Sequence, residues 1–153
     1  MPITEFLQKP LPALRLAART VTVRDWSEVG EAVGAAFDHI AGIIGDTPGT
    51  LHAPVASYSW TADGLRIVVG YVYEGEARGG VEIAELPEES HALCTAHYGP
   101  VSGIAESWQA LHAELEARGL RPGGPSRELY LRAESEDQHD WVTELQQPVI
   151  PAD

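Results

Sequence analysis

The order of hydrophobic patterns along the chain constrains its fold more than any other feature. Two segments, at about 25–44 and 101–115, carry apolar residues three and four positions apart, which predicts helices that are buried on one face. Each follows a segment of alternating polarity typical of a strand, and each precedes two more such segments. The order strand, helix, strand, strand thus occurs twice, over about 13–74 and 91–149. This pattern predicts an α+β fold built from two similar units.

The first unit is predicted from its strand patterns and from the signals at the ends of its helix. Asp25 and Glu28 have the spacing of a capping box, and Gly45 and Pro48 are typical of a helix end. A turn at residues 62–64 predicts a hairpin between the last two strands. The three strands are expected at 13–23, 55–60 and 65–74.

The second unit is predicted in the same way. Gly99 and Pro100 are expected to open its helix, and Gly119 is expected to end it. Residues 1–12, which include two prolines, are expected to pack loosely. A short strand is expected at 81–86, and the strands of the second unit at 90–98, 127–132 and 141–149.

The strand at 127–132 presents a choice between two interpretations. Because strand side chains alternate, Leu129 and Leu131 share one face, and Glu128 and Tyr130 share the other. If the second face is solvated, the arrangement is ordinary. If that face is buried, a carboxylate and a phenol lie together in the interior, which would be unusual.

Length and composition favour one globular domain over residues 1–153. The chain has 153 residues, of which 44% are hydrophobic. No apolar run has the length of a membrane span, and the N-terminus lacks the features of a signal peptide, so we expect a cytoplasmic protein without a membrane partner. The single cysteine, Cys94, excludes an internal disulfide and is interpreted as a small core residue.

The charge of the chain argues against nucleic acid as a partner. The formal net charge is −13, from 23 acidic and 10 basic residues, whereas binding to phosphates needs a basic face. The histidines lack the spacing of a metal site, and the sequence has no glycine-rich phosphate loop or serine nucleophile elbow. We therefore expect neither a metal nor a cofactor. The oligomeric state stays open.

Four segments occur in a characteristic order. They are Leu86-Pro87, His97-Tyr98-Gly99-Pro100 with the helix that follows, Arg127–Leu131, and Trp141–Val149. Together they resemble the GyrI-like small-molecule-binding domain, which is also the effector-binding domain of multidrug regulators of the AraC and MerR types. No single segment is specific, but the ordered set is fairly specific and covers about 13–149. The resemblance implies two units related by a pseudo-two-fold axis, with a ligand pocket between them.

The resemblance also implies that aromatic side chains line this pocket around one acidic residue, which is Glu128 in this sequence. In the regulators the equivalent glutamate attracts lipophilic cations. No basic helix-turn-helix segment flanks the domain here, so the chain resembles stand-alone members. Those members resemble either sequestering proteins or, in one subset, hydrolases that open cyclopropane-bearing DNA-alkylating toxins.

The residues themselves are compatible with a cation site. A carboxylate among aromatic rings is partly desolvated, and an entering cation gains Coulomb energy and about 0.5 to 2 kcal/mol of cation–π energy per ring. Trp108 has the spacing of a helical core residue, so its place in the pocket is left open. Glu144 is interpreted as part of a polar outer face, and His97 as either a proton shuttle or a cap of the bend. The candidate ligand-binding residues are Glu128, Tyr58, Trp60, Tyr71, Tyr98, Trp108, Tyr130 and Trp141.

Two functions fit these residues. The first is binding of small lipophilic or planar, often cationic, molecules for sensing or sequestration. The alternative is a cofactor-free hydrolase, in which Glu128 acts as the general base and Tyr130 donates a hydrogen bond to an oxygen that gains charge. A binding pocket and such an active site look alike in sequence, so enzymatic activity stays undecided.

Overall fold

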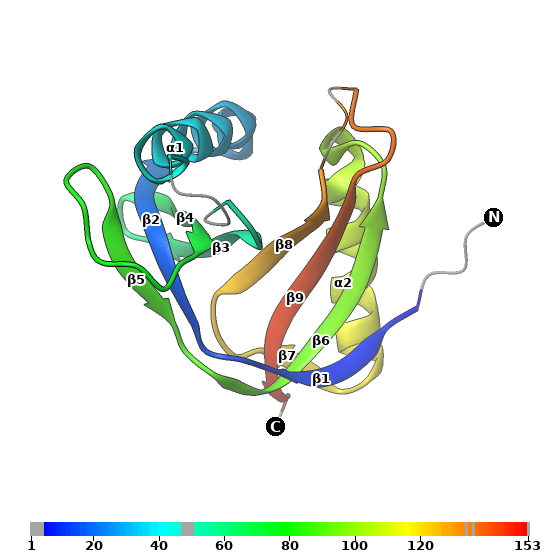
Figure 1. Ribbon diagram of the computed structural model, residues 1–153. Helices are drawn as coiled ribbons and strands as arrows, with labels where there is room; N and C mark the ends of the chain where they lie inside the picture. The colour runs from blue at the N-terminus through cyan, green and yellow to red at the C-terminus, as the bar shows by residue number, and fades with distance from the viewer. Residues whose placement is uncertain (1–4, 47–50, 134, 136, 153) are drawn as a thin grey trace. The chain divides into compact units, whose positions relative to one another are not determined.

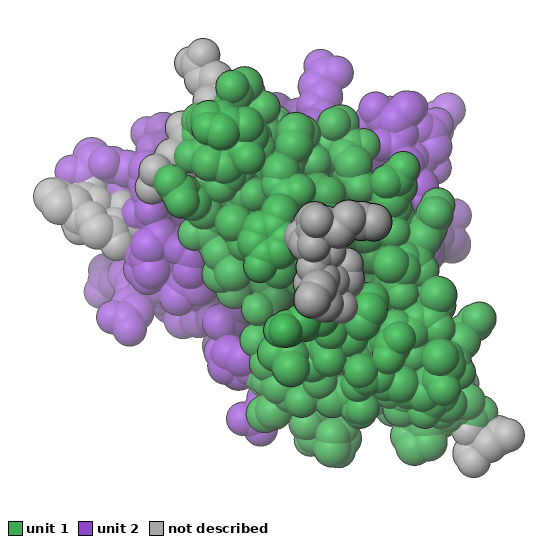
Figure 2. All heavy atoms as spheres, turned by 90° about the vertical axis from the view of Figure 1, so that its right-hand side faces the viewer, with its two compact units in different colours: residues 1–11, 89–153 green, residues 12–88 purple. Residues whose placement is uncertain are grey.

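The computed structural model describes residues 5–46, 51–133, 135 and 137–152. The chain divides into two compact units: unit 1 comprises residues 1–11 and 89–153, and unit 2 comprises residues 12–88 (Figure 2). Over the residues that the structure describes, each unit contains one α-helix and a set of antiparallel strands. The prediction of an α+β fold is therefore confirmed, as is the order strand, helix, strand, strand in each unit.

Unit 2 is an antiparallel sheet with one helix on its face. The strands lie in the order β3-β4-β2-β5. Their bounds are β2 (Leu14–Val23), β3 (Pro54–Thr61), β4 (Gly64–Val72) and β5 (Glu82–Leu86). Helix α1 (Val29–Ile44) packs on β2 and β4 (Figure 1). The side chains that α1 buries recur at the predicted helical spacing, namely Val33, Ala36, Ile40 and Ile44.

The predicted cap of this helix forms one turn early, on a 3₁₀ turn, η1 (Trp26–Glu28). Asp25 Oδ1 accepts a hydrogen bond from the backbone N–H of Ser27 at 2.9 Å, and Glu28 Oε2 accepts one from the backbone N–H of Arg24 at 3.3 Å. Hydrogen bonds from Ser27 hold the pKa of the Asp25 carboxyl below its usual value. Gly45 ends α1 as predicted, and Pro48 lies outside the described residues.

Unit 1 repeats this plan, with five strands among the described residues where unit 2 has four. Its strands lie in the order β1-β6-β9-β8, all antiparallel, and β7 pairs with β9. Their bounds are β1 (Leu7–Leu11), β6 (Glu89–Tyr98), β7 (Leu120–Pro122), β8 (Ser126–Arg132) and β9 (Val142–Pro151). Helix α2 (Ile104–Ala117), preceded by the 3₁₀ turn η2 (Val101–Gly103), lies against this sheet (Figure 1). The core between them contains Leu93, Leu111, Leu115, Leu145 and Val149.

Three details differ from the sequence expectations. The expectation that residues 1–12 pack loosely is wrong for 7–11, because these residues form β1 on β6 and Leu11 is only 1% exposed. Strand β7 was not expected. Helix α2 begins one turn later than expected, because Pro100 opens the 3₁₀ turn rather than the α-helix.

Glycine is needed at two predicted boundaries of α2. Gly99 before η2 and Gly119 after α2 have φ values of 96° and 72°, a region that favours glycine. Within the described residues, none of the helices combines the length and apolar character needed to cross a membrane.

Candidate functional site

Glu128, at the third position of β8, is buried in unit 1. Its side chain is 4% exposed, whereas Leu131 on the opposite strand face is 57% exposed. In the register of β8 with β9, Glu128 lies opposite Leu145, a core residue beneath α2. Because residues opposite each other in an antiparallel pair share a face, Glu128 faces α2. The interpretation of this face as solvated is therefore wrong.

Both carboxylate oxygens of Glu128 accept hydrogen bonds from aromatic side chains. The indole Nε1 of Trp108 donates to Oε2 at 2.7 Å, and the hydroxyl of Tyr130 donates to Oε1 at 2.7 Å. Trp108 is the fifth residue of α2, and Tyr130 follows Glu128 by two positions on the same strand face. A helix and a strand thus each supply one neutral donor to the same buried carboxylate.

Trp108 belongs to the core and to this group at the same time. Its partly buried ring packs on the hydrophobic cluster beneath α2, as its helical spacing predicts. The ring centroid of His112, one turn further along α2, lies 6.1 Å from that of Trp108. Sequence periodicity identified the packing of Trp108, but it could not show that the indole N–H is directed at Glu128.

Unit 2 provides an internal comparison for the Glu128 group. Glu128 lies on the strand after α2, opposite a buried leucine of β9. On the strand after α1, Ala56 and Tyr58 lie opposite a buried valine and a buried isoleucine of β4. Among the described residues, unit 2 buries no acidic side chain, whereas unit 1 buries Glu128.

His97 connects the end of β6 to the start of α2. It is buried, with its Nε2 2.8 Å from the carbonyl oxygen of Pro100 and its Nδ1 2.7 Å from the hydroxyl of Ser107. Since a carbonyl can only accept, Nε2 donates to Pro100, while Nδ1 is hydrogen-bonded to the hydroxyl of Ser107. These contacts fit the interpretation of His97 as a cap of the bend.

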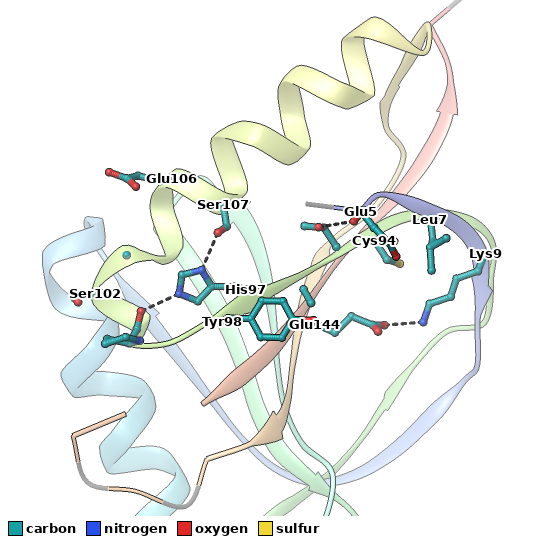
Figure 3. Close-up of a pocket in the computed structure, with 14 residues that line it drawn as sticks. Glu5, Leu7, Lys9, Cys94, His97, Tyr98, Ser102, Glu106, Ser107 and Glu144 are labelled. Atoms are coloured by element: carbon teal, nitrogen blue, oxygen red, sulfur yellow. Dashed lines mark hydrogen bonds and ion pairs between the residues drawn. The ribbon is translucent and has the colours of Figure 1, made fainter. Parts of the chain in front are cut away.

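A separate polar cavity of about 690 Å³ lies in unit 1, along β6 and the start of α2 (Figure 3). Its lining includes His97, Ser107 and Glu144, but not Glu128. Lys9 Nζ forms an ion pair with Glu144 at 2.8 Å, and this interaction raises the pKa of the Lys9 ammonium. Glu144 is therefore ion-paired and partly enclosed, rather than part of a freely solvated face.

The other two candidates in unit 1 do not contact Glu128 in this way. Tyr98 is 66% exposed and lines the polar cavity. It follows His97 on β6, so it faces away from the α2 side of the sheet. The indole Nε1 of Trp141 donates to the carbonyl oxygen of Ser135 at 2.8 Å, just before β9.

The three candidates in unit 2 lie in one cluster of three aromatic rings and one aromatic pair. Tyr58 is buried, and its ring centroid lies 6.0 Å from that of Trp26. The ring centroid of Trp26 also lies 6.4 Å from that of Trp60, which is exposed. Tyr71 packs edge-on against Phe37 at 5.3 Å, and burial raises the pKa of its phenol, with a smaller effect of the Asp38 carboxylate. Trp26 was not identified from the sequence, because a single aromatic residue in a helix-start turn has no periodic signal.

The chain matches a known protein family over most of its length. The sequence profile of the family described as GyrI-like small molecule binding domain matches residues 9–150. A search among curated proteins finds no match.

Among the part of the chain that the structure describes, no group of three or more His, Cys, Asp or Glu side chains is placed to hold a metal ion.

Solved structures share the fold at low sequence identity. The EcmrR C-terminal domain has 19% identity and a TM-score of 0.76, with 98% of this chain and 99% of that chain covered. SAV2435 bound to tetraphenylphosphonium has 17% identity and a TM-score of 0.66, with 95% and 94% covered. A hydrolase encoded by lin2189 from Listeria innocua has 14% identity and a TM-score of 0.60, with 95% and 92% covered.

Proposed function

This chain belongs to the family of GyrI-like small-molecule-binding domains, and on that premise we propose that Glu128, Trp108 and Tyr130 form its ligand site. The ligand class that we propose is lipophilic or planar molecules, especially cations, bound for sensing or sequestration. The observation that carries this proposal is the buried carboxylate of Glu128, held by an indole and a phenol.

The chemistry of this group supports a cationic ligand. Burying a carboxylate costs free energy unless hydrogen bonds and charge compensate for lost water. Trp108 and Tyr130 donate to this carboxylate as neutral groups. A lipophilic cation adds a positive charge beside the carboxylate, and its apolar surface packs on the aromatic rings. Among the described residues, unit 2 buries no acidic side chain, which also supports a role for this group beyond packing.

Related structures supply a probe for this proposal. Tetraphenylphosphonium is bound to SAV2435, and its charge is shielded by phenyl groups that form no hydrogen bonds. We propose that this chain takes cations of the same kind. Tyr58, Trp60 and Tyr71 of unit 2 remain candidates predicted from the sequence.

A thermal-shift panel tests the ligand class. Lipophilic cations such as tetraphenylphosphonium should raise the melting temperature of the wild-type protein, because a ligand that binds only the folded state stabilises it. The same compounds should have little effect on Glu128→Gln, while neutral planar aromatics should affect both proteins alike. If the cations stabilise Glu128→Gln as much as wild type, the proposed role of Glu128 is wrong.

The hydrogen bond between Tyr130 and Glu128 also favours a second candidate, a hydrolase. Glu128 would take a proton from water as the water oxygen bonds to an electrophilic ring carbon. The strained C–C bond would then break and pass its electron pair to a conjugated carbonyl oxygen, to which Tyr130 would donate a hydrogen bond in place of its bond to Glu128. Incubation with a cyclopropane-containing alkylator, followed by mass spectrometry, separates the candidates. More than one equivalent of ring-opened, water-added product, lost in Glu128→Gln, indicates an enzyme, whereas stoichiometric retention of unchanged compound indicates a binder.

A further inference from the structure

Thr143, on β9 beneath α2, has a buried hydroxyl without a hydrogen-bond partner. Thr143 is 0% exposed. Among the described residues, its Oγ1 is the only buried side-chain oxygen or nitrogen atom that lacks a hydrogen-bond partner. Buried polar groups in native proteins are nearly always hydrogen-bonded, and an exception needs an explanation. The position of Thr143 in the sheet suggests one.

The two side chains beside Thr143 make their hydrogen bonds to other groups. In the register of the sheet, Thr143 lies between His97 on β6 and Tyr130 on β8, and all three face α2. The ring nitrogens of His97 contact Ser107 and the carbonyl oxygen of Pro100. The hydroxyl of Tyr130 donates to Glu128. Thr143 is therefore a polar residue next to the Glu128 group, yet it takes no part in the bonds of that group.

Unit 2 offers a comparison for the middle strand of the sheet beneath the helix. On that strand, β4, the buried residues that alternate along one face are Leu65, Ile67 and Val69, all aliphatic. The middle strand of unit 1, β9, has the buried Thr143 two positions before the buried Leu145 on one face. An unpaired hydroxyl lowers stability relative to an aliphatic side chain of the same shape. The threonine therefore needs a reason other than packing.

We propose that Thr143 is a specificity residue of the Glu128 site and that its hydroxyl binds an oxygen of the ligand. Tyr130, directly opposite Thr143, is only partly buried. The Cβ atoms of such opposite residues lie about 4.5 to 5.5 Å apart, so a ligand that contacts Tyr130 lies within about one side-chain length of Thr143. The preferred ligand is then a lipophilic cation that also carries a hydroxyl, carbonyl or ether oxygen. This inference rests on the proposed function, in which Glu128 supplies the charge.

Matched probe pairs test this specificity. The probes are tolyl(triphenyl)phosphonium and (hydroxymethylphenyl)triphenylphosphonium, each as ortho, meta and para isomers, so that one member of each pair adds only a hydroxyl. With wild type, at least one hydroxymethyl isomer should bind more tightly than its tolyl counterpart. In Thr143→Val this preference should fall by about 5- to 10-fold, the value of one hydrogen bond, while the tolyl affinities stay within about 2-fold.

Further variants keep the test independent of folding and of the Glu128 proposal. Thr143→Ser keeps the hydroxyl and should keep the preference, and Thr143→Val should melt no lower than wild type, because it removes an unpaired polar group. If Glu128→Gln leaves all six affinities unchanged, the proposed function fails. If Glu128→Gln weakens all six affinities, the role of Glu128 stands. The role of Thr143 is then refuted by either of two results: Thr143→Val leaves the hydroxymethyl preference intact, or no isomer shows a preference with wild type.

Discussion

The indole Nε1 of Trp108 donates a hydrogen bond to Oε2 of Glu128 across 2.7 Å, which joins helix α2 to strand β8 inside unit 1. Trp108 and Glu128 are 20 residues apart in the sequence. One contact therefore links a core residue of the helix to the buried carboxylate that we propose as the centre of the ligand site. Its consequences can be measured without knowing the natural ligand.

Replacing Trp108 by phenylalanine should destabilise the protein. The variant keeps an aromatic ring but removes one donor from the buried Glu128 carboxylate, which should lower the free energy of unfolding by about 1 to 3 kcal/mol. Urea denaturation measures this loss. Trp60→Phe is the matched control, because Trp60 is 62% exposed and such a change should stay within about 0.5 kcal/mol. Equal stabilities of the two variants would contradict the assigned hydrogen bond.

A triple variant separates a role in stability from a role in binding. Glu128→Met, Trp108→Phe and Tyr130→Phe together replace the three polar groups by apolar side chains of similar size. Replacing both partners of a buried hydrogen bond by apolar groups can be nearly neutral, unlike removing one partner. We therefore expect urea stability close to wild type, above that of Glu128→Met alone, with no binding of tetraphenylphosphonium. A triple variant less stable than each single variant would indicate a structural role.

Cys94 should make stability depend on pH in the alkaline range. Burial raises the pKa of its thiol from 9.0 to about 12, and the Glu144 carboxylate adds to this effect. Because the folded pKa is the higher one, the stabilisation is complete below pH 9 and is lost as the pH rises towards 12. Between pH 8 and pH 10, wild type should lose about 1 kcal/mol more unfolding free energy than Cys94→Ala. Parallel pH profiles of the two proteins would refute this.

His139 should titrate above the usual range of histidine. Its hydrogen bond and ion pair with Asp137 raise the pKa of the imidazole above 6.5, and the same hydrogen bond lowers the pKa of Asp137 to about 2. Any stabilisation from His139 is therefore present below pH 6.5 and is lost as the pH rises through the folded value. NMR titration of the imidazole should show a midpoint that falls in Asp137→Asn. An unchanged midpoint would show that the pair does not form in solution.

The sequence predicted the periodic elements of the fold but not its short strands. The four side chains that α1 buries and the core residues of α2 follow the three-and-four spacing that identified both helices. Strand β1 was missed because Pro10 and its neighbours have low strand propensity, and pairing with β6 overrides that preference. Strand β7 has three residues, too few for a periodic signal.

The candidate site was identified only in part. Strand alternation placed Glu128 and Tyr130 on one face, but it could not decide whether that face was buried, because burial depends on the helix that packs on it. The hydrogen bond from Trp108 and the unpaired hydroxyl of Thr143 depend on contacts between segments distant in the sequence. No pattern within one strand or helix carries such information.

The most direct test of the account is the affinity of tetraphenylphosphonium for wild type, Glu128→Gln and Glu116→Gln, measured by isothermal titration calorimetry. Glu116 is an exposed residue of α2, so its variant makes the same change in net charge away from the site. We expect Glu128→Gln to lose at least about tenfold in affinity, because a charge pair about 4 Å apart at an effective dielectric constant of about 20 is worth more than about 1.4 kcal/mol. Glu116→Gln should stay within about twofold of wild type, as long-range surface charges are screened by salt. Equal affinities of all three proteins, or equal losses in both variants, would contradict the central role of Glu128.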